Sequence, residues 1–210
     1  MRAFQVSKIG EPAELSQVTA PNAAFGEVLV KISTCGLNFA DLLMQTGQYQ
    51  DTPPAPFTLG MEIAGTVEAI GEGVTSPAIG TRVAVFGGQG GLADYGTYDA
   101  RTAIEIPDKM SMTDAAAFQI AYGTSHVALG YRANLQAGET LLVLGAAGGI
   151  GLTAVEIGKL MGATVIAVAR GADKLEVAGK AGADHVIDAG VEDLRAELKA
   201  LGGVDVVYDP

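Results

Sequence analysis

A glycine-rich turn between two apolar segments is the feature that most restricts how this chain can fold. Thr140–Leu144 is apolar after its first residue, and Gly145–Gly151 follows it directly. A helix-like stretch, Gly149–Met161, and a second apolar segment, Thr164–Ala169, come next. Apolar runs of this length are typical of strands buried on both faces of a parallel sheet. The segment therefore predicts a strand–turn–helix–strand unit whose helix begins at the glycine turn.

The turn has the main chain that a pyrophosphate group requires. In the best register, Ala146-x-Gly148-x-x-Gly151, Gly148 lets the backbone approach the phosphates and Gly151 lets the helix pack closely. The free N–H groups and the dipole at the start of a helix attract negative charge. We therefore expect a nucleotide to contact six residues of the turn: Ala146, Ala147, Gly148, Gly149, Ile150 and Gly151.

The residues after the second apolar segment indicate which nucleotide binds. Units that prefer NAD carry an acidic residue about twenty positions after the glycines, where it binds the ribose. This stretch instead has Arg170, with Lys174 one helical turn later. Both cations suit the 2′-phosphate of NADP, which is therefore the expected cofactor. The alternative is that they are solvated loop charges, and Asp173 is assigned to the dipole of the next helix.

Charge and composition exclude several classes of partner. The 210-residue chain has a net charge of −11, which argues against a nucleic acid or an anionic membrane. No segment approaches the roughly twenty apolar residues of a membrane span, and the first residues do not resemble a signal peptide. Cys35 is the only cysteine, so neither an intrachain disulfide nor an all-cysteine metal site can form. We expect a cytoplasmic protein.

Two halves of the chain have different patterns. Residues 1–112 contain short strand-like segments separated by glycine and proline, which predicts a mostly antiparallel, barrel-like β domain. The strands expected there are Arg2–Ser7, Glu27–Thr34, Glu62–Ile70, Arg82–Phe86, Asp94–Tyr98 and Ala103–Ile106.

Residues 113–210 alternate between strands and helices, which predicts a doubly wound parallel sheet and an α/β fold class. A helix capped by Thr113 is expected to run to about Arg132. The later elements are expected at Thr140–Leu144, Gly149–Met161, Thr164–Ala169, Asp173–Ala181, His185–Ile187, Val191–Leu201 and Val204–Tyr208. The sheet would be truncated after its fourth strand, so we expect a fragment of a longer enzyme.

Motifs in a specific order extend along the whole chain. They are Cys35–Asp41, Thr46–Tyr49, Leu59–Val67, Gly90–Tyr95, Tyr122–Thr124, Gly145–Gly151 and Gly182–Ile187. In this order the chain resembles the zinc-independent medium-chain dehydrogenase/reductase family, specifically its NADPH:quinone oxidoreductase branch. The resemblance implies a GroES-like β domain (residues 1–112) followed by a Rossmann domain that binds NADP (residues 113–210). It also implies a homodimer.

The same resemblance predicts that no metal is bound. Zinc-containing relatives have a cysteine at the position of Asn38, a histidine at that of Met61 and a cysteine near Ala116, whereas only Glu62 remains here. Asparagine and methionine are poor zinc ligands, and alanine is none. Without a Lewis acid, the acceptor of the hydride has to be electron-poor already, as in a quinone or an α,β-unsaturated carbonyl compound.

The resemblance implies that Asn38, Tyr49 and Asp41 line the substrate cleft. Asn38 would donate to the acceptor carbonyl or to the ribose, and Tyr49 would supply a hydroxyl group and an aromatic face. Asp41 has an alternative role, because it lies where a helix is expected to begin. Thr124 is either a nicotinamide contact or a hydroxyl that bonds to the preceding helical turn.

Three functions are compatible with these residues. The first is hydride transfer from NADPH to a quinone or similar carbonyl acceptor. Some quinone reductases have tyrosines where this chain has Leu43 and Ala189, and these departures weaken the assignment to benzoquinone-type substrates. The second function is an enoyl or alkenal reductase that acts on a conjugated C=C bond, for which the same cleft would serve. The third is a non-catalytic NADPH-binding module.

Overall fold

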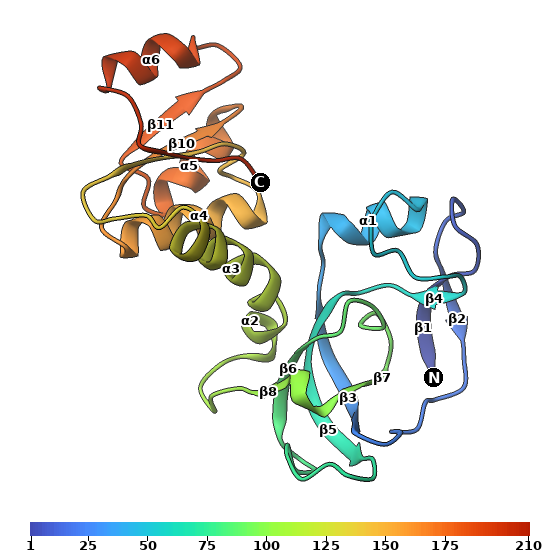
Figure 1. The fold of residues 1–210 in the computed structure, drawn as a ribbon. Coiled ribbons are helices and arrows are strands. Elements are labelled where there is room, and N and C mark those ends of the chain that lie inside the picture. The colour runs from blue at the N-terminus through green and yellow to red at the C-terminus, as the bar shows by residue number, and fades with distance from the viewer. The chain divides into compact units, whose positions relative to one another are not determined.

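A five-stranded antiparallel sheet is the framework of the first half of the chain in the computed structural model, which describes residues 1–210 (Figure 1). Its order is β7-β3-β5-β6-β8, with bounds β3 Glu27–Gly36, β5 Glu62–Ile70, β6 Arg82–Phe86, β7 Tyr95–Asp99 and β8 Ala103–Glu105. Alternate side chains point to one face of such a sheet. Its buried core is formed by Val28, Val30, Ile63, Val67, Val83, Val85 and Tyr98.

A smaller antiparallel sheet, in the order β2-β1-β4, joins this framework. The strands are β1 Arg2–Val6, β2 Glu14–Gln17 and β4 Phe57–Thr58. Phe4 N–H donates to the carbonyl oxygen of Leu92 at 2.8 Å and so connects β1 to the chain before β7. The structure confirms all the strands predicted in this half, but β2 and β4 were not predicted. Both are short, and β2 has no buried residue, so neither has a distinct apolar pattern.

Contacts divide the chain into two compact units, Met1–Gln119 and Ile120–Pro210. Helix α2 (Met112–Ala116) belongs to the first unit, although the boundary at residue 112 that the sequence suggested would place all but its first residue in the second domain. It packs against β3, β5 and β6. Ala115 and Ala116 are buried there against Ala64, Ala84 and Ile106.

The prediction of one helix from Thr113 to Arg132 is wrong. Three elements occupy this region: α2, α3 (Gln119–His126) and a π-helix, η2 (Val127–Arg132). The predicted cap is also wrong, because the N-cap of α2 is Ser111, whose hydroxyl oxygen accepts from Asp114 N–H at 3.0 Å. The break separates a helix that packs on the first sheet from helical turns in the second unit, which an uninterrupted helical sequence pattern does not reveal.

The second unit is a parallel sheet of four strands in the order β11-β10-β9-β12. Its strands are β9 Thr140–Val143, β10 Thr164–Ala169, β11 His185–Asp188 and β12 Val206–Tyr208. Its helices are α4 Gly149–Leu160, α5 Ala172–Lys180 and α6 Leu194–Ala200. Every element predicted after Thr140 is confirmed, and β12 lies at an edge beside β9.

Alternate residues of the central strands bury two different faces. Leu141 and Val165 pack on one side with α4 and α5, whereas Leu142 and Ile166 pack on the other side with α6. Two covered faces explain why these strands are apolar without interruption. None of the helices has both the length and the apolar composition that crossing a membrane requires.

Candidate cofactor and substrate site

The glycine turn brings the start of α4 against the end of β9. Ala146 N–H donates to Val168 O at 3.0 Å, which ties the turn to the neighbouring strand β10. A Cβ atom at Gly151 would lie 2.3 Å from the carbonyl oxygen of Gly145, so no side chain fits there. Gly148, the N-cap residue, offers no side chain to cap the helix. The first N–H groups of α4 are therefore available to an anion.

A cavity of about 450 Å³ opens beside this turn. The turn, the chain after β10 and the chain after β11 contribute its walls: Gly145, Ala147, Gly148, Arg170, Lys174 and Ala189. Its floor is apolar and includes Leu144 and Val168. The carboxyl ends of three parallel strands thus meet at one cavity, which is where open α/β sheets bind their ligands.

Arg170 and Lys174 carry the positive charge of this cavity. Both side chains are exposed, and neither takes part in any of the ion pairs of the structure. Their charges are therefore not neutralised by a carboxylate of the protein. A cavity that combines such cations with free helical N–H groups is suited to a ligand with several phosphates.

The other residues predicted at the turn lie around the cavity rather than in its wall. Ala146 is completely buried in the core of the second unit. Gly149, Ile150 and Gly151 form the first turn of α4, and none of them lines the cavity. Thr124 is exposed on α3 and also does not line it.

Two buried hydroxyl groups support the turn from behind, and the sequence did not single them out. Ser125 Oγ donates to Ile150 O at 3.0 Å and lies 2.8 Å from Thr153 Oγ1. Thr153 Oγ1 lies 3.0 Å from the carbonyl oxygen of Ala121. These contacts fix α3 against the first turn of α4. Hydroxyl residues inside apolar helical segments were the only signal that the sequence offered.

Helix α1 (Phe39–Thr46) positions the residues predicted for substrate binding in the first unit. Asp41 is buried, and both of its oxygens accept from the main chain: Oδ2 from Asn38 N–H at 2.9 Å and Oδ1 from Gly60 N–H at 3.0 Å. The carboxylate therefore holds the start of α1 to the segment around Gly60. It leaves the side chain of Asn38 free to turn elsewhere.

The Asn38 amide turns toward Glu62. Its Nδ2 donates to Glu62 Oε1 at 2.9 Å, and Glu62 is only 3% exposed. A Cβ atom at Gly36 would lie 2.7 Å from Glu62 and 2.5 Å from the carbonyl oxygen of Ala116, so these residues are close neighbours. Nowhere in the structure do three His, Cys, Asp or Glu side chains form a group that could hold a metal ion. The donors around Asn38 thus do not fit a zinc ion, which needs three or four good ligands.

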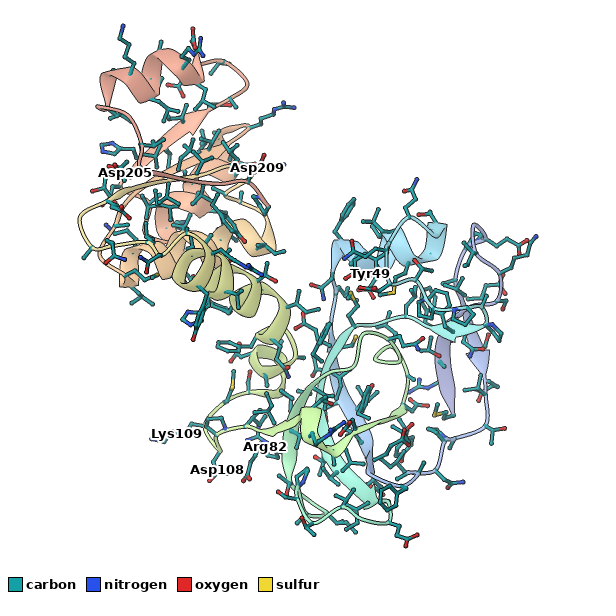
Figure 2. The ribbon with its side chains drawn as sticks, viewed as in Figure 1. Tyr49, Arg82, Asp108, Lys109, Asp205 and Asp209 are labelled. Carbon is teal, nitrogen blue, oxygen red and sulfur yellow. The ribbon has the colours of Figure 1, made fainter.

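Tyr49 lines a cavity that neither Asn38 nor Asp41 lines. This cavity has a volume of about 290 Å³, and Tyr49 shares it with Met44, Met61, Phe86 and Gln89 (Tyr49 is labelled in Figure 2). Its walls are mostly apolar, and they would accept a flat, weakly polar molecule.

Cys35 lies near the same carboxylates. Its Sγ donates to Gly36 O at 3.3 Å. Burial, together with the charges of Asp41 and Glu62, raises the pKa of the thiol to about 12. The protonated thiol is therefore a packing group rather than a nucleophile.

Comparison with known proteins connects these features. Residues 24–108 match the alcohol dehydrogenase GroES-like domain family, and residues 149–210 match the zinc-binding dehydrogenase family. A probable oxidoreductase from Mycobacterium abscessus is 37% identical, with a TM-score of 0.91 over 100% of this chain and 69% of its own. Quinone oxidoreductase from Escherichia coli, solved with NADPH, is 33% identical, with a TM-score of 0.94 over 100% of this chain and 66% of its own.

The chain belongs to the quinone oxidoreductase branch of the medium-chain dehydrogenase/reductase family. This membership confirms the predicted fold class, a GroES-like unit followed by a Rossmann-type parallel sheet. The "quinone oxidoreductase-like protein 2 homolog" of Nematostella vectensis is 38% identical over 95% of this chain and 55% of its own length. The chain thus spans less than two thirds of such curated relatives.

Proposed function

We propose that this member of the quinone oxidoreductase branch transfers a hydride from NADPH to a quinone or a similar electron-poor carbonyl acceptor, without zinc. One observation carries the proposal. A single cavity combines an uncapped helix start with two cations, Arg170 and Lys174, that have no carboxylate partner. The E. coli quinone oxidoreductase, solved as a complex with NADPH, supports the choice of coenzyme.

The residues of the cavity would divide the binding of NADPH. The first N–H groups of α4 would hold the pyrophosphate, because the helix dipole favours negative charge there. Arg170 and Lys174 would bind the 2′-phosphate, and Thr124 would contact the nicotinamide. Bound NADPH supplies the hydride, so the protein has to position the acceptor and to bind the charge that arrives.

In the first unit, Asn38 and Tyr49 are proposed to bind the acceptor. An amide group has two N–H donors, and Asn38 uses one of them on Glu62. The other could donate to the oxygen that becomes negative when hydride is transferred. Tyr49 would present its ring and hydroxyl group to a flat acceptor. Asp41 would position Asn38, since its carboxylate holds the main chain of that residue.

The donor set supports a hydride transfer without zinc. Of the four positions 38, 61, 62 and 116, only Glu62 carries a residue that commonly binds zinc, and its Oε1 already accepts from Asn38. Elemental analysis of the purified protein tests this part of the proposal. A stoichiometric metal that is lost together with activity would contradict it.

The test of function is NADPH oxidation with a panel of quinones and enones. Turnover with quinones supports the proposal, whereas turnover with enones alone would indicate an enoyl or alkenal reductase. NADPH binding without any turnover would indicate a non-catalytic module.

A Gly148→Val variant should lose the binding of both NADPH and NADH, because the side chain would occupy the place of the phosphates. Retained binding would place the phosphates elsewhere.

Coenzyme preference is tested separately. In the double variant Arg170→Ala/Lys174→Ala, the Kd for NADPH should rise by about a hundredfold, whereas the Kd for NADH should change little, because only NADPH carries the 2′-phosphate. Equal effects on both coenzymes would contradict the assignment.

The proposal also includes a cytoplasmic homodimer with no nucleic-acid or membrane partner. Light scattering on the purified protein measures the mass of the assembly.

A further inference from the structure

The carboxylate of Asp188 connects two separate segments of the main chain. Asp188 is the last residue of β11. Its Oδ1 accepts from Gly190 N–H at 2.8 Å, and its Oδ1 and Oδ2 accept from Gly171 N–H at 3.2 and 3.3 Å. Gly171 follows β10 and Gly190 follows β11, so one side chain bonds to the turns that leave two neighbouring strands.

Residues beside both turns line the 450 Å³ cavity. Arg170 and Lys174 stand on either side of Gly171 in the sequence, and Ala189 precedes Gly190. All three of those neighbours line the cavity, whereas Asp188 does not. Asp188 is thus placed behind the walls, where it can hold them together without touching a ligand.

Gly171 needs such support. It has a φ of 87°, in the left-handed region, and it is the N-cap residue of α5 without a side-chain cap of its own. A glycine has a wide choice of backbone conformations, so its own preference does not fix the direction of the chain. Hydrogen bonds to a charged acceptor are stronger than those to a neutral one, and Asp188 supplies them here. The direction of the chain at Gly171 determines where the flanking cations lie.

We propose that Asp188 is a specificity-determining positioning residue that sets the preference for NADPH over NADH. The inference rests on the proposed function, in which Arg170 and Lys174 bind the 2′-phosphate. By fixing Gly171, Asp188 keeps both cations within reach of that phosphate. NADH has no such group, so it gains nothing from this arrangement.

The sign of the effect distinguishes positioning from simple electrostatics. A carboxylate near a phosphate repels it, so its removal would strengthen NADPH binding if charge alone mattered. Positioning has the opposite consequence, since removal frees the turn and weakens the binding of NADPH. The observed orientation favours positioning, because both oxygens of Asp188 face main-chain N–H groups.

The test is a fluorescence titration of the full chain with NADPH and NADH under identical salt conditions. In Asp188→Ala, the Kd for NADPH should rise about tenfold and that for NADH by less than about twofold, as expected for the loss of a charge-assisted contact. Asp188→Asn should lie between this variant and the wild type, because the amide keeps one acceptor oxygen. In the double variant Asp188→Ala/Arg170→Ala, the second substitution should add little.

Asp184 provides a matched control. Its Oδ2 accepts from Val165 N–H at 2.7 Å and from Lys159 Nζ at 2.8 Å, so it also joins neighbouring segments, but at the start of β10 and β11. Asp184→Ala should leave both coenzyme affinities unchanged. Thermal unfolding of every variant shows whether it is folded.

Two results would overturn the inference: an equal rise in the Kd for both coenzymes in folded Asp188→Ala and Asp188→Asn, or tighter binding of NADPH. Failure of the proposed function gives a different result. In that case the wild type itself would show no preference for NADPH, and the inference would fall with it.

Discussion

At the scale of single residues, the neighbouring atoms explain the protonation of Cys35 and the need for glycine at position 151. Cys35 is kept protonated by burial and by nearby carboxylates. Gly151 is required because the helix passes within collision distance of the turn. The need for glycine at position 151 could be predicted from the motif. The protonation of the Cys35 thiol could not, because it depends on residues that are distant in the sequence.

The thiol of Cys35 should react slowly with alkylating reagents. A pKa of about 12, against an ordinary value of 9.0, lowers the thiolate fraction at neutral pH. The rate of alkylation by iodoacetamide, followed by mass spectrometry, should therefore be about a thousandfold lower in the folded protein than in the unfolded protein. Similar rates in the two states would show that the thiol is not shielded.

A side chain at position 151 should destabilise the second unit. In Gly151→Ala, the Cβ atom would lie 2.3 Å from Gly145 O, so the helix or the turn has to move. We expect the free energy of unfolding in urea to fall by about 1–3 kcal/mol. The matched control is Gly149→Ala, because a Cβ atom there meets nothing within 4 Å. Equal losses in both variants would refute the steric explanation.

At the scale of elements, long apolar or alternating strands were predictable, whereas elements defined by tertiary contacts were not. Buried strands such as β10 have an uninterrupted apolar pattern, so their positions follow from the hydrophobic effect. The helix predicted over 113–132 is divided because α2 packs on the first sheet. In the candidate site, the glycine turn and its two cations were visible in the sequence. The supports behind them, Asp188 and Ser125, were not, because their partners are distant main-chain groups.

Arg82 on β6 holds the chain segment that leads into α2. Its guanidinium group donates to the carbonyl oxygens of Asp108 at 2.9 Å and Met110 at 2.5 Å (Arg82, Asp108 and Lys109 are labelled in Figure 2). Arg82→Ala leaves these carbonyl groups without this donor, so the free energy of unfolding of the first unit should fall by about 1–3 kcal/mol. Urea unfolding measures the change.

Lys109 is the control for Arg82. It lies in the same segment and takes part in none of the ion pairs of the structure. Lys109→Ala should change stability by less than about 0.5 kcal/mol, as is usual for an exposed side chain. If Lys109→Ala lowers the free energy of unfolding as much as Arg82→Ala does, positive charge stabilises the segment, and the carbonyl contacts of Arg82 do not.

At the scale of the whole molecule, stability should decrease as the solution becomes alkaline. Burial raises the pKa of the Tyr98 hydroxyl group in the first unit, and burial also raises that of Cys35 to about 12. Both groups keep their protons in the folded state at a pH at which the unfolded chain has already released them. Their contribution is complete below the ordinary pKa of the thiol, 9.0, and decreases as pH rises toward the folded values.

The melting temperature of the wild type should therefore fall between about pH 9 and about pH 11. The melting temperature of Cys35→Ala should fall less steeply over the same range. Differential scanning calorimetry over this range checks both points. An identical slope in the variant would show that other groups are responsible.

The open side of β12 has a practical consequence. Val207 is 56% exposed on this outermost strand, whose outer main-chain groups have no strand beside them. Apolar strands in this situation are templates for another polypeptide. A polypeptide made of these 210 residues alone should therefore cloud or form oligomers through this strand at high concentration, and Val207→Lys should delay the onset of turbidity.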